Sequence, residues 1–183
     1  GMALFYIKDA LEELNKITET HFNTQRIDIT EDKFEEYWLS KTPTSMPCDV
    51  KISPSTFEYL STIVARNIDE LGPYANPRFG QIWRNKYSKT DYQDSHIHPR
   101  SQCSFIIYET VKESKTNFIN PSRSLIINQL EFYPEHLPTE FTPTLGPGDM
   151  LIFPSFLEHF VLAGNEGTTI SGNVYLDPPP NDE

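Results

Sequence analysis

The second half of the chain constrains the fold most. After Pro77, short runs rich in Ile, Val, Phe, Tyr and Thr alternate with Pro, Gly, Asn and Asp, which is typical of short strands joined by turns. Seven prolines from Pro99 to Pro154 suit the edges and turns of a many-stranded β structure better than a parallel sheet. The predicted strands are residues 80–87, 93–98, 102–110, 116–119, 125–132, 150–153, 159–163 and 168–176.

Helices are predicted before this β-rich region. Residues 7–20 carry apolar side chains at helical spacing, and Thr30 is suited to cap a second short helix that runs through Trp38. Residues 55–71 follow the helical period most clearly, and Gly72 with the proline after it predicts where that helix ends.

Helices followed by about eight short strands predict an α+β fold. We expect N-terminal helices packed on a double-stranded β-helix, that is, a cupin-like jelly roll. The 183 residues suit a single domain over 1–183. Within it, 2–78 would be mainly helical, 79–176 would form the jelly-roll core and 177–183 would be a flexible tail.

The charge of the chain excludes some partners. Fifteen Lys and Arg against 26 Asp and Glu give a net charge of −11, which disfavours binding to nucleic acid. No run approaches the roughly 18 apolar residues of a membrane helix. Two cysteines, Cys48 and Cys103, are too few for a disulfide framework and favour a reduced, cytoplasmic protein.

No Lys or Arg follows Arg123, whereas nine acidic residues do. This acidic final third is either a solvated face or the neighbourhood of a cation.

Three histidines form the strongest chemical signal. His96 and His98 are two residues apart in a predicted strand, so both rings would project from one face. His159 lies about sixty residues later, at a distance that a jelly roll can close. Imidazole groups suit iron, zinc, copper or nickel, and the alternative is that all three are surface or hydrogen-bonded histidines. His21 and His136 have no such context and are interpreted as structural.

Several motifs between Trp83 and Leu176 resemble those of the non-haem iron, 2-oxoglutarate-dependent oxygenases, in a bacterial and phage branch of that superfamily. The branch reads W-x-N, then H-x-H-P-x-S-x-x-S-G-x-x-Y, then a short F-x-x-P element and a G-x-x-x-x-F-P-S-x-x-x-H block. The corresponding stretches here are Trp83–Asn85, His96–Tyr108, Phe118–Pro121 and Gly148–His159. The fold of that family is a double-stranded β-helix, which agrees with the predicted strands.

The resemblance implies that Fe(II) and 2-oxoglutarate are the cofactors and that His96, His98 and His159 are the metal ligands and catalytic residues. One departure concerns the ligand set, because the superfamily usually places a carboxylate where His98 stands. Asp94 or Glu158 would then assist the metal, and strand alternation favours Asp94 slightly.

A second departure concerns the far carboxylate of 2-oxoglutarate. The superfamily usually holds it with an arginine about ten residues after the last histidine, where this chain has Thr169. The resemblance and strand alternation lead us to predict the following cofactor-binding residues: Tyr87, Tyr108, Arg100, Thr169 and Ser171. The candidate cations for that carboxylate are Arg84, Lys86, Arg100 and Arg123.

Three functions therefore stay open. The first is an Fe(II)- and 2-oxoglutarate-dependent oxygenase that hydroxylates a small-molecule or peptide substrate. The second is a cupin-like metal-dependent dioxygenase that does not use 2-oxoglutarate, which the missing arginine favours. The third is a non-catalytic jelly-roll binding or virion-associated protein.

Overall fold

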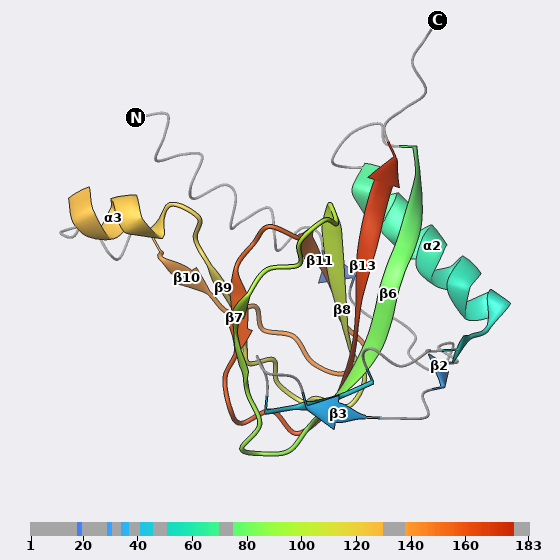
Figure 1. The fold of residues 1–183 in the computed structure, drawn as a ribbon, viewed down its shortest axis with the longest axis horizontal. Coiled ribbons are helices and arrows are strands. Elements are labelled where there is room, and N and C mark those ends of the chain that lie inside the picture. Colours follow the sequence, from blue (N-terminus) through green and yellow to red (C-terminus); the bar gives the residue numbers. More distant parts are fainter. Residues whose placement is uncertain are drawn as a thin grey trace, which may run out of the picture.

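The structure is a computed structural model that describes residues 18–19, 29–30, 34–36, 41–45, 51–69, 75–129 and 138–177. Most of the described elements are strands in antiparallel pairs (Figure 1). Short strands precede the main β region: β1 (Thr18–Glu19), β2 (Ile29–Thr30), β3 (Glu35–Glu36), β4 (Pro43–Thr44) and β5 (Lys51–Ile52). The strands that follow are β6 (Ala75–Tyr87), β7 (Gln93–His96), β8 (Cys103–Tyr108), β9 (Thr116–Ile119), β10 (Glu140–Phe141), β11 (Met150–Pro154), β12 (His159–Val161) and β13 (Gly167–Asp177).

Two main sheets organise the molecule. The larger one has seven strands in the order β1-β11-β8-β13-β6-β4-β3, and the smaller one has four in the order β10-β9-β12-β7. Strands β2 and β5 form a separate pair. Strands that are far apart in sequence are neighbours in both sheets, as in a jelly roll. The antiparallel β fold predicted from the sequence is therefore confirmed.

Alternating side chains of the large sheet serve two separate cores. On β8, Phe105 and Ile107 belong to one cluster, whereas Ile106 and Tyr108 belong to the other. The first cluster includes Leu60, Ile63 and Val64, so helix α2 (Pro54–Asp69) covers that face of the sheet. The second cluster adds Phe118 of β9 and Val161 of β12, and so lies between the two sheets. The candidate site opens on this second face.

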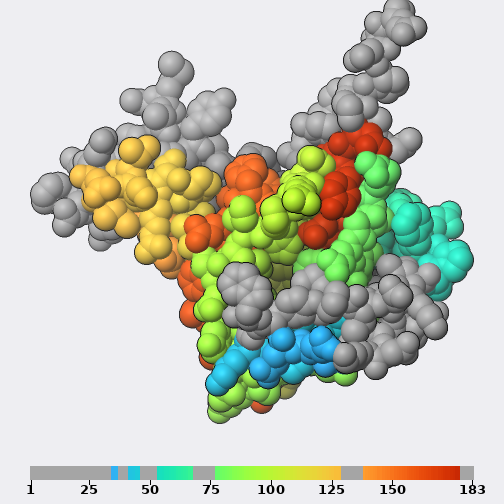
Figure 2. All heavy atoms as spheres, viewed as in Figure 1, coloured from blue at the N-terminus to red at the C-terminus, as the bar shows by residue number. Residues whose placement is uncertain are grey.

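The described helices differ in their packing. Helix α2 confirms the helix predicted over 55–71. Helix α3 (Arg123–Gln129, yellow) protrudes on the side of the molecule opposite to helix α2 (teal) in the view of Figure 2. No helix among the described residues is long and apolar enough to span a membrane.

Three expectations need correction. The strand predicted over 125–132 is wrong in its described part, which lies in α3. The helix predicted from Thr30 to Trp38 is wrong where the chain is described, because Thr30 ends β2 and Glu35–Glu36 form β3. The helix predicted over 7–20 lies outside the described residues except at Thr18–Glu19, which pair with β11 as a strand.

Candidate metal centre

Strand pairing brings the two histidine motifs together. β12 pairs with β7 so that His159 lies directly opposite His96. On its other side β12 pairs with β9, which places His159 opposite Phe118 in the interior of the small sheet. The predicted strand 93–98 ends two residues early, at His96. His98 is still fixed, because its backbone N–H donates to the carbonyl of Ser155 (3.0 Å).

The three rings converge on one point. The ring centroids of His96 and His159 are 4.4 Å apart, those of His98 and His159 5.1 Å, and those of His96 and His98 5.3 Å. One ring nitrogen from each histidine lies within 4.8 Å of the other two. The predicted convergence is therefore present in the structure.

The distance between the Nε2 atoms of His98 and His159 is 3.3 Å. Two imidazole nitrogens bound about 2.1 Å from one ion, at an angle between a right angle and the tetrahedral angle, are separated by roughly 3.0–3.4 Å. The spacing therefore fits two ligands of the same metal ion.

Hydrogen bonds at Nδ1 orient all three rings. Nδ1 of His96 lies 2.6 Å from the carbonyl of Asp94, and Nδ1 of His159 lies 2.9 Å from the carbonyl of Leu157. Nδ1 of His98 lies 2.8 Å from the side-chain oxygen of Asn173. Because each of these oxygens only accepts, every Nδ1 donates, and a neutral ring then carries its lone pair at Nε2.

Burial keeps the three imidazoles neutral. It lowers the pKa of His96 and of His159, the latter also because the two other histidines are close. Burial also lowers the pKa of His98 to about 4, against the opposing effect of the Asn173 hydrogen bond. Neutral imidazole is the form that binds a metal, so the group is a set of donors that is ready at pH 7.

Aromatic side chains hold these rings in place. The Trp83 ring stacks on His98 with centroids 5.6 Å apart and planes at 18°. Phe153 meets His159 edge to face at 5.0 Å, and Phe118 lies 5.4 Å from the same ring. These contacts keep the inner side of the donor set apolar, which strengthens electrostatic interactions there.

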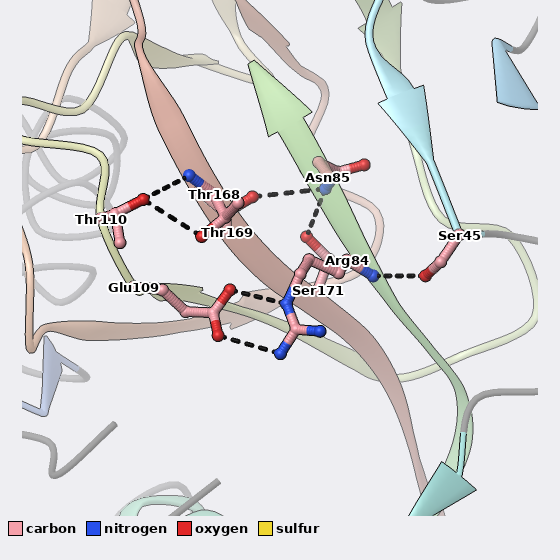
Figure 3. Close-up of polar contacts among 8 residues, drawn as sticks. All are labelled: Ser45, Arg84, Asn85, Glu109, Thr110, Thr168, Thr169 and Ser171. Carbon is pink, nitrogen blue, oxygen red and sulfur yellow. Dashed lines mark hydrogen bonds and ion pairs between the residues drawn. The ribbon is translucent and has the colours of Figure 1, made fainter. Parts of the chain in front are cut away.

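A cavity of about 390 Å³ adjoins the histidines. Three of the predicted cofactor-binding residues, Tyr87, Thr169 and Ser171, line it. Asn85 lies among them, and its side-chain amide donates to the hydroxyls of Thr169 (3.3 Å) and Ser171 (3.4 Å), as Figure 3 shows. This part of the cavity therefore presents several uncharged hydrogen-bonding groups.

Two of the predicted cofactor-binding residues do not line the cavity. Tyr108 is fully buried, and its hydroxyl bonds to Ser114 (2.9 Å) and Thr116 (3.1 Å) instead. Arg100 is exposed and has a φ of 71°, because the chain turns sharply after Pro99 and breaks the strand alternation on which the prediction depended. Neither residue is therefore placed to contact a molecule in this cavity.

The candidate carboxylates also lie outside the histidine group. Asp94 is exposed and contributes its backbone carbonyl to His96 rather than its side chain. Glu158 is exposed and accepts a hydrogen bond from Ser95 (2.6 Å). Among the described residues, the group that is arranged for a metal ion consists of histidines alone.

The candidate cations make other contacts. Arg84 forms a two-pronged ion pair with Glu109 at 2.8 and 3.0 Å (Figure 3). Lys86 lies 3.6 Å from the centre of the Phe34 ring, and Arg123 is 3.6 Å from Glu140. None of the described residues that line the cavity is a Lys or an Arg.

Sequence reasoning assigned no role to Asn173 or to Ser155, although Ser155 is the serine of the F-P-S block. Asn173 lies on β13, outside the motifs quoted from the sequence. It belongs to a hydrogen-bond network that also contains Ser101 and Ser104, two serines that match the family motif.

These features fit the two groups that the sequence motifs imply. Three neutral nitrogen donors with their Nδ1 atoms already bonded suit a first-row transition metal such as Fe(II). The adjoining cavity offers room and uncharged donors for a small organic acid such as 2-oxoglutarate.

Comparison with known proteins agrees with this geometry. Residues 81–169 match a family described as "Putative 2OG-Fe(II) oxygenase". A search of curated protein sequences found no significant match.

Two solved structures have a similar fold. A prolyl-4-hydroxylase from Pseudomonas putida superposes with a TM-score of 0.51 at 11% identity, covering 94% of this chain and 99% of that one. An oxidoreductase of the 2OG-Fe(II) oxygenase family from Burkholderia pseudomallei gives 0.50 at 16% identity, covering 98% and 82%. The family match includes His96, His98, His159 and Thr169, and it agrees with the resemblance found in the motifs: residues 81–169 of this chain are similar to the 2-oxoglutarate- and Fe(II)-dependent oxygenases.

Proposed function

We propose that this protein is an Fe(II)- and 2-oxoglutarate-dependent oxygenase that hydroxylates a small-molecule or peptide substrate. The observation that carries the proposal is that one ring nitrogen from each of three neutral imidazoles lies within 4.8 Å of the other two, while each Nδ1 is bonded to an oxygen. His96, His98 and His159 are the proposed metal ligands. The free thiol of Cys103 supports a cytoplasmic location as part of the same proposal.

Fe(II) and 2-oxoglutarate, when bound, supply the activation of O₂ that is coupled to oxidative decarboxylation of the 2-oxo acid. The chain contributes by holding the metal ion and the 2-oxo acid, by orienting the ligand imidazoles and by excluding water. The rings of Trp83, Phe118 and Phe153 fix the ligand imidazoles and keep water from their inner side.

The residues of the inner cavity would hold the far end of the 2-oxo acid. The hydroxyls of Thr169 and Ser171 are buried, and Asn85 joins them through its amide group. Burial raises the pKa of Tyr87, so its phenol stays protonated at neutral pH and can donate a hydrogen bond. These groups supply hydrogen bonds but no positive charge.

The experiment is turnover of the wild-type protein with Fe(II), 2-oxoglutarate and O₂, followed by succinate formation. We expect succinate only when all three are present, at a slow rate without the substrate. Protein that binds Fe(II) but forms no succinate would overturn the use of 2-oxoglutarate.

A second candidate function is that of a metal-dependent dioxygenase that does not use 2-oxoglutarate. One observation favours it, namely that the described residues of the cavity wall include no Lys or Arg. Bound Fe(II) with no calorimetric signal for 2-oxoglutarate would support this second candidate.

A further inference from the structure

A chain of hydroxyl groups, two of them fully buried, ends at His98 of the candidate metal centre. The chain links Ser101, Ser155, Ser104 and Asn173, and it reaches Nδ1 of His98. Its successive distances are 2.8 Å, 2.8 Å, 3.1 Å and 2.8 Å. Ser104 and Ser155 are fully buried, so water does not compete for these bonds.

The donors in this chain all run in one direction. The hydroxyl of Ser101 donates to Ser155, and the hydroxyl of Ser104 donates to the side-chain oxygen of Asn173. The bond between Ser155 and Ser104 is then made by the proton of Ser155, since the proton of Ser104 is already used. Bonds aligned in this way polarise one another, so the hydroxyl of Ser104 becomes a stronger donor to the Asn173 oxygen and holds that oxygen in place.

The same oxygen receives the Nδ1 proton of His98. Ser104 donates to this oxygen as well, so an amide rotated to present its NH₂ group to the ring would need the donors at Ser104 and Ser155 to reverse. In the arrangement of the structure, the network favours the His98 tautomer with the proton on Nδ1 and the lone pair on Nε2.

The backbone holds the members of the network in register. Asn173 of β13 lies opposite Ser104 of β8, and Ser104 lies opposite Phe153 of β11. The carbonyl of Ser155 accepts from the N–H of His98, and the N–H of Ser155 donates to the carbonyl of Gln102. Three adjacent strands thus fix both the ring and its acceptor.

We propose that Asn173 is a positioning residue that, with Ser101, Ser104 and Ser155, fixes the tautomer and orientation of His98 and so allows a neutral imidazole to act as the third metal ligand. The part of this proposal that concerns the metal rests on the proposed function. It gives a role to Ser101 and Ser104, which the sequence motif contains and the oxygenase reaction itself does not use.

The test compares Asn173→Leu, Asn173→Asp and Ser104→Ala with wild type in two measurements. Long-range proton–nitrogen correlation NMR of the metal-free protein reports which ring nitrogen of His98 carries the proton. Competition with a chelator reports the affinity for Co(II). Matched controls are Asn117→Leu and Ser114→Ala, which remove a buried amide and a buried hydroxyl that do not contact the histidines.

We expect Asn173→Leu to lose the single Nδ1–H tautomer and to weaken Co(II) binding by roughly 10- to 100-fold. Asn173→Asp keeps an acceptor and should retain both properties, and Ser104→Ala should shift both in the direction of Asn173→Leu. The controls should match wild type. If Asn173→Leu does not fold, Asn173→Asp and Ser104→Ala still provide the comparison.

An unchanged tautomer and unchanged Co(II) affinity in Asn173→Leu would overturn the proposal, as would an equal loss in the controls. A wild-type protein that binds no Co(II) would contradict the proposed function instead, whereas the tautomer measurement would still decide the role of Asn173.

Discussion

Nε2 of His98 and Nε2 of His159 face each other at 3.3 Å, although both atoms carry lone pairs. Each ring already donates its Nδ1 proton, to Asn173 in one case and to the carbonyl of Leu157 in the other. Two acceptors held this close repel unless a cation lies between them. The fold has therefore brought together two groups that a bound metal ion would stabilise.

Replacing His159 by alanine should abolish metal binding and leave the domain folded. The ring supplies one of three ligands, and although Phe118 and Phe153 pack against it, the core that α2 covers contains neither residue. We expect the Fe(II) affinity to fall by more than about 100-fold, beyond the usual effect of losing a group outside the ligand set. Metal analysis and circular dichroism check the two parts, and a variant that keeps one iron per chain would show that His159 is not a ligand.

The metal-free protein should lose stability as the pH falls from about 6.5 towards 4. Burial lowers the pKa of His98 to about 4, so below its usual value near 6.5 the unfolded chain binds a proton that the folded chain excludes. Across that window His98 alone lowers the free energy of unfolding by about 3 kcal/mol. Above pH 6.5 this group contributes no dependence on pH.

Urea unfolding at several pH values measures this effect, with His98→Asn as the variant that removes the titrating ring. If the free energy of unfolding depends on pH between 4 and 6.5 equally in wild type and in His98→Asn, then the pKa of His98 is not lowered.

Thr169→Arg should tighten 2-oxoglutarate binding. Thr169 is buried in the cavity wall, which lacks a Lys or Arg among its described residues, so the new guanidinium would be the missing partner of a carboxylate. A charge-assisted hydrogen bond contributes about 1.5–3 kcal/mol, or roughly one to two decades of affinity. Calorimetry on the iron-loaded protein measures the change.

The matched control is Thr168→Arg, which adds the same charge one residue earlier on β13, on the opposite face of the strand. Equal tightening by both substitutions would indicate a general effect of charge. Tight binding by wild type that survives the loss of Arg84, Arg100 and Arg123 in turn would contradict the view that the absent arginine weakens binding.

Gly167→Ala should destabilise the protein more than Gly164→Ala. Both glycines have positive φ, 124° and 109°, which costs an alanine about 1–3 kcal/mol. A Cβ at Gly167 would also lie 2.7 Å from the backbone carbon of Thr110, whereas at Gly164 the nearest contact is a lysine side chain at 3.8 Å. Thermal unfolding of the two variants checks the order, and equal losses would show that the Thr110 contact relaxes at no cost.

Local patterns predicted the regular elements well. The strand predicted over 116–119 is confirmed with the same bounds, and the described part of the helix predicted over 55–71 lies in α2 because its apolar side chains follow the helical period. The strand predicted over 125–132 is wrong because β-favouring residues in this run were taken to be buried in a sheet, whereas the described part forms a largely exposed helix. Within residues 123–128 of α3, Ile126 alone is buried, while Leu125 and Ile127 are 58% and 47% exposed.

The site was predictable only where a motif marks it. The spacing of the two histidine motifs indicated the ligand set, but the bond from His98 to Asn173 joins residues 75 positions apart, and no local pattern reveals it. Arg100 was misplaced because alternation was extended past Pro99 into a turn with positive φ. Pairings across the sheets, which place Asn85 beside Thr169, depend on strand order and register rather than on sequence neighbours.

Anaerobic titration of the metal-free wild-type protein with Fe(II), alongside a variant in which His96, His98 and His159 are all alanine, tests the central claim most directly. We predict one Fe(II) bound per wild-type chain and none in the variant, with both proteins folded. Equal iron binding by the two proteins, or none by either, would contradict the three-histidine metal centre.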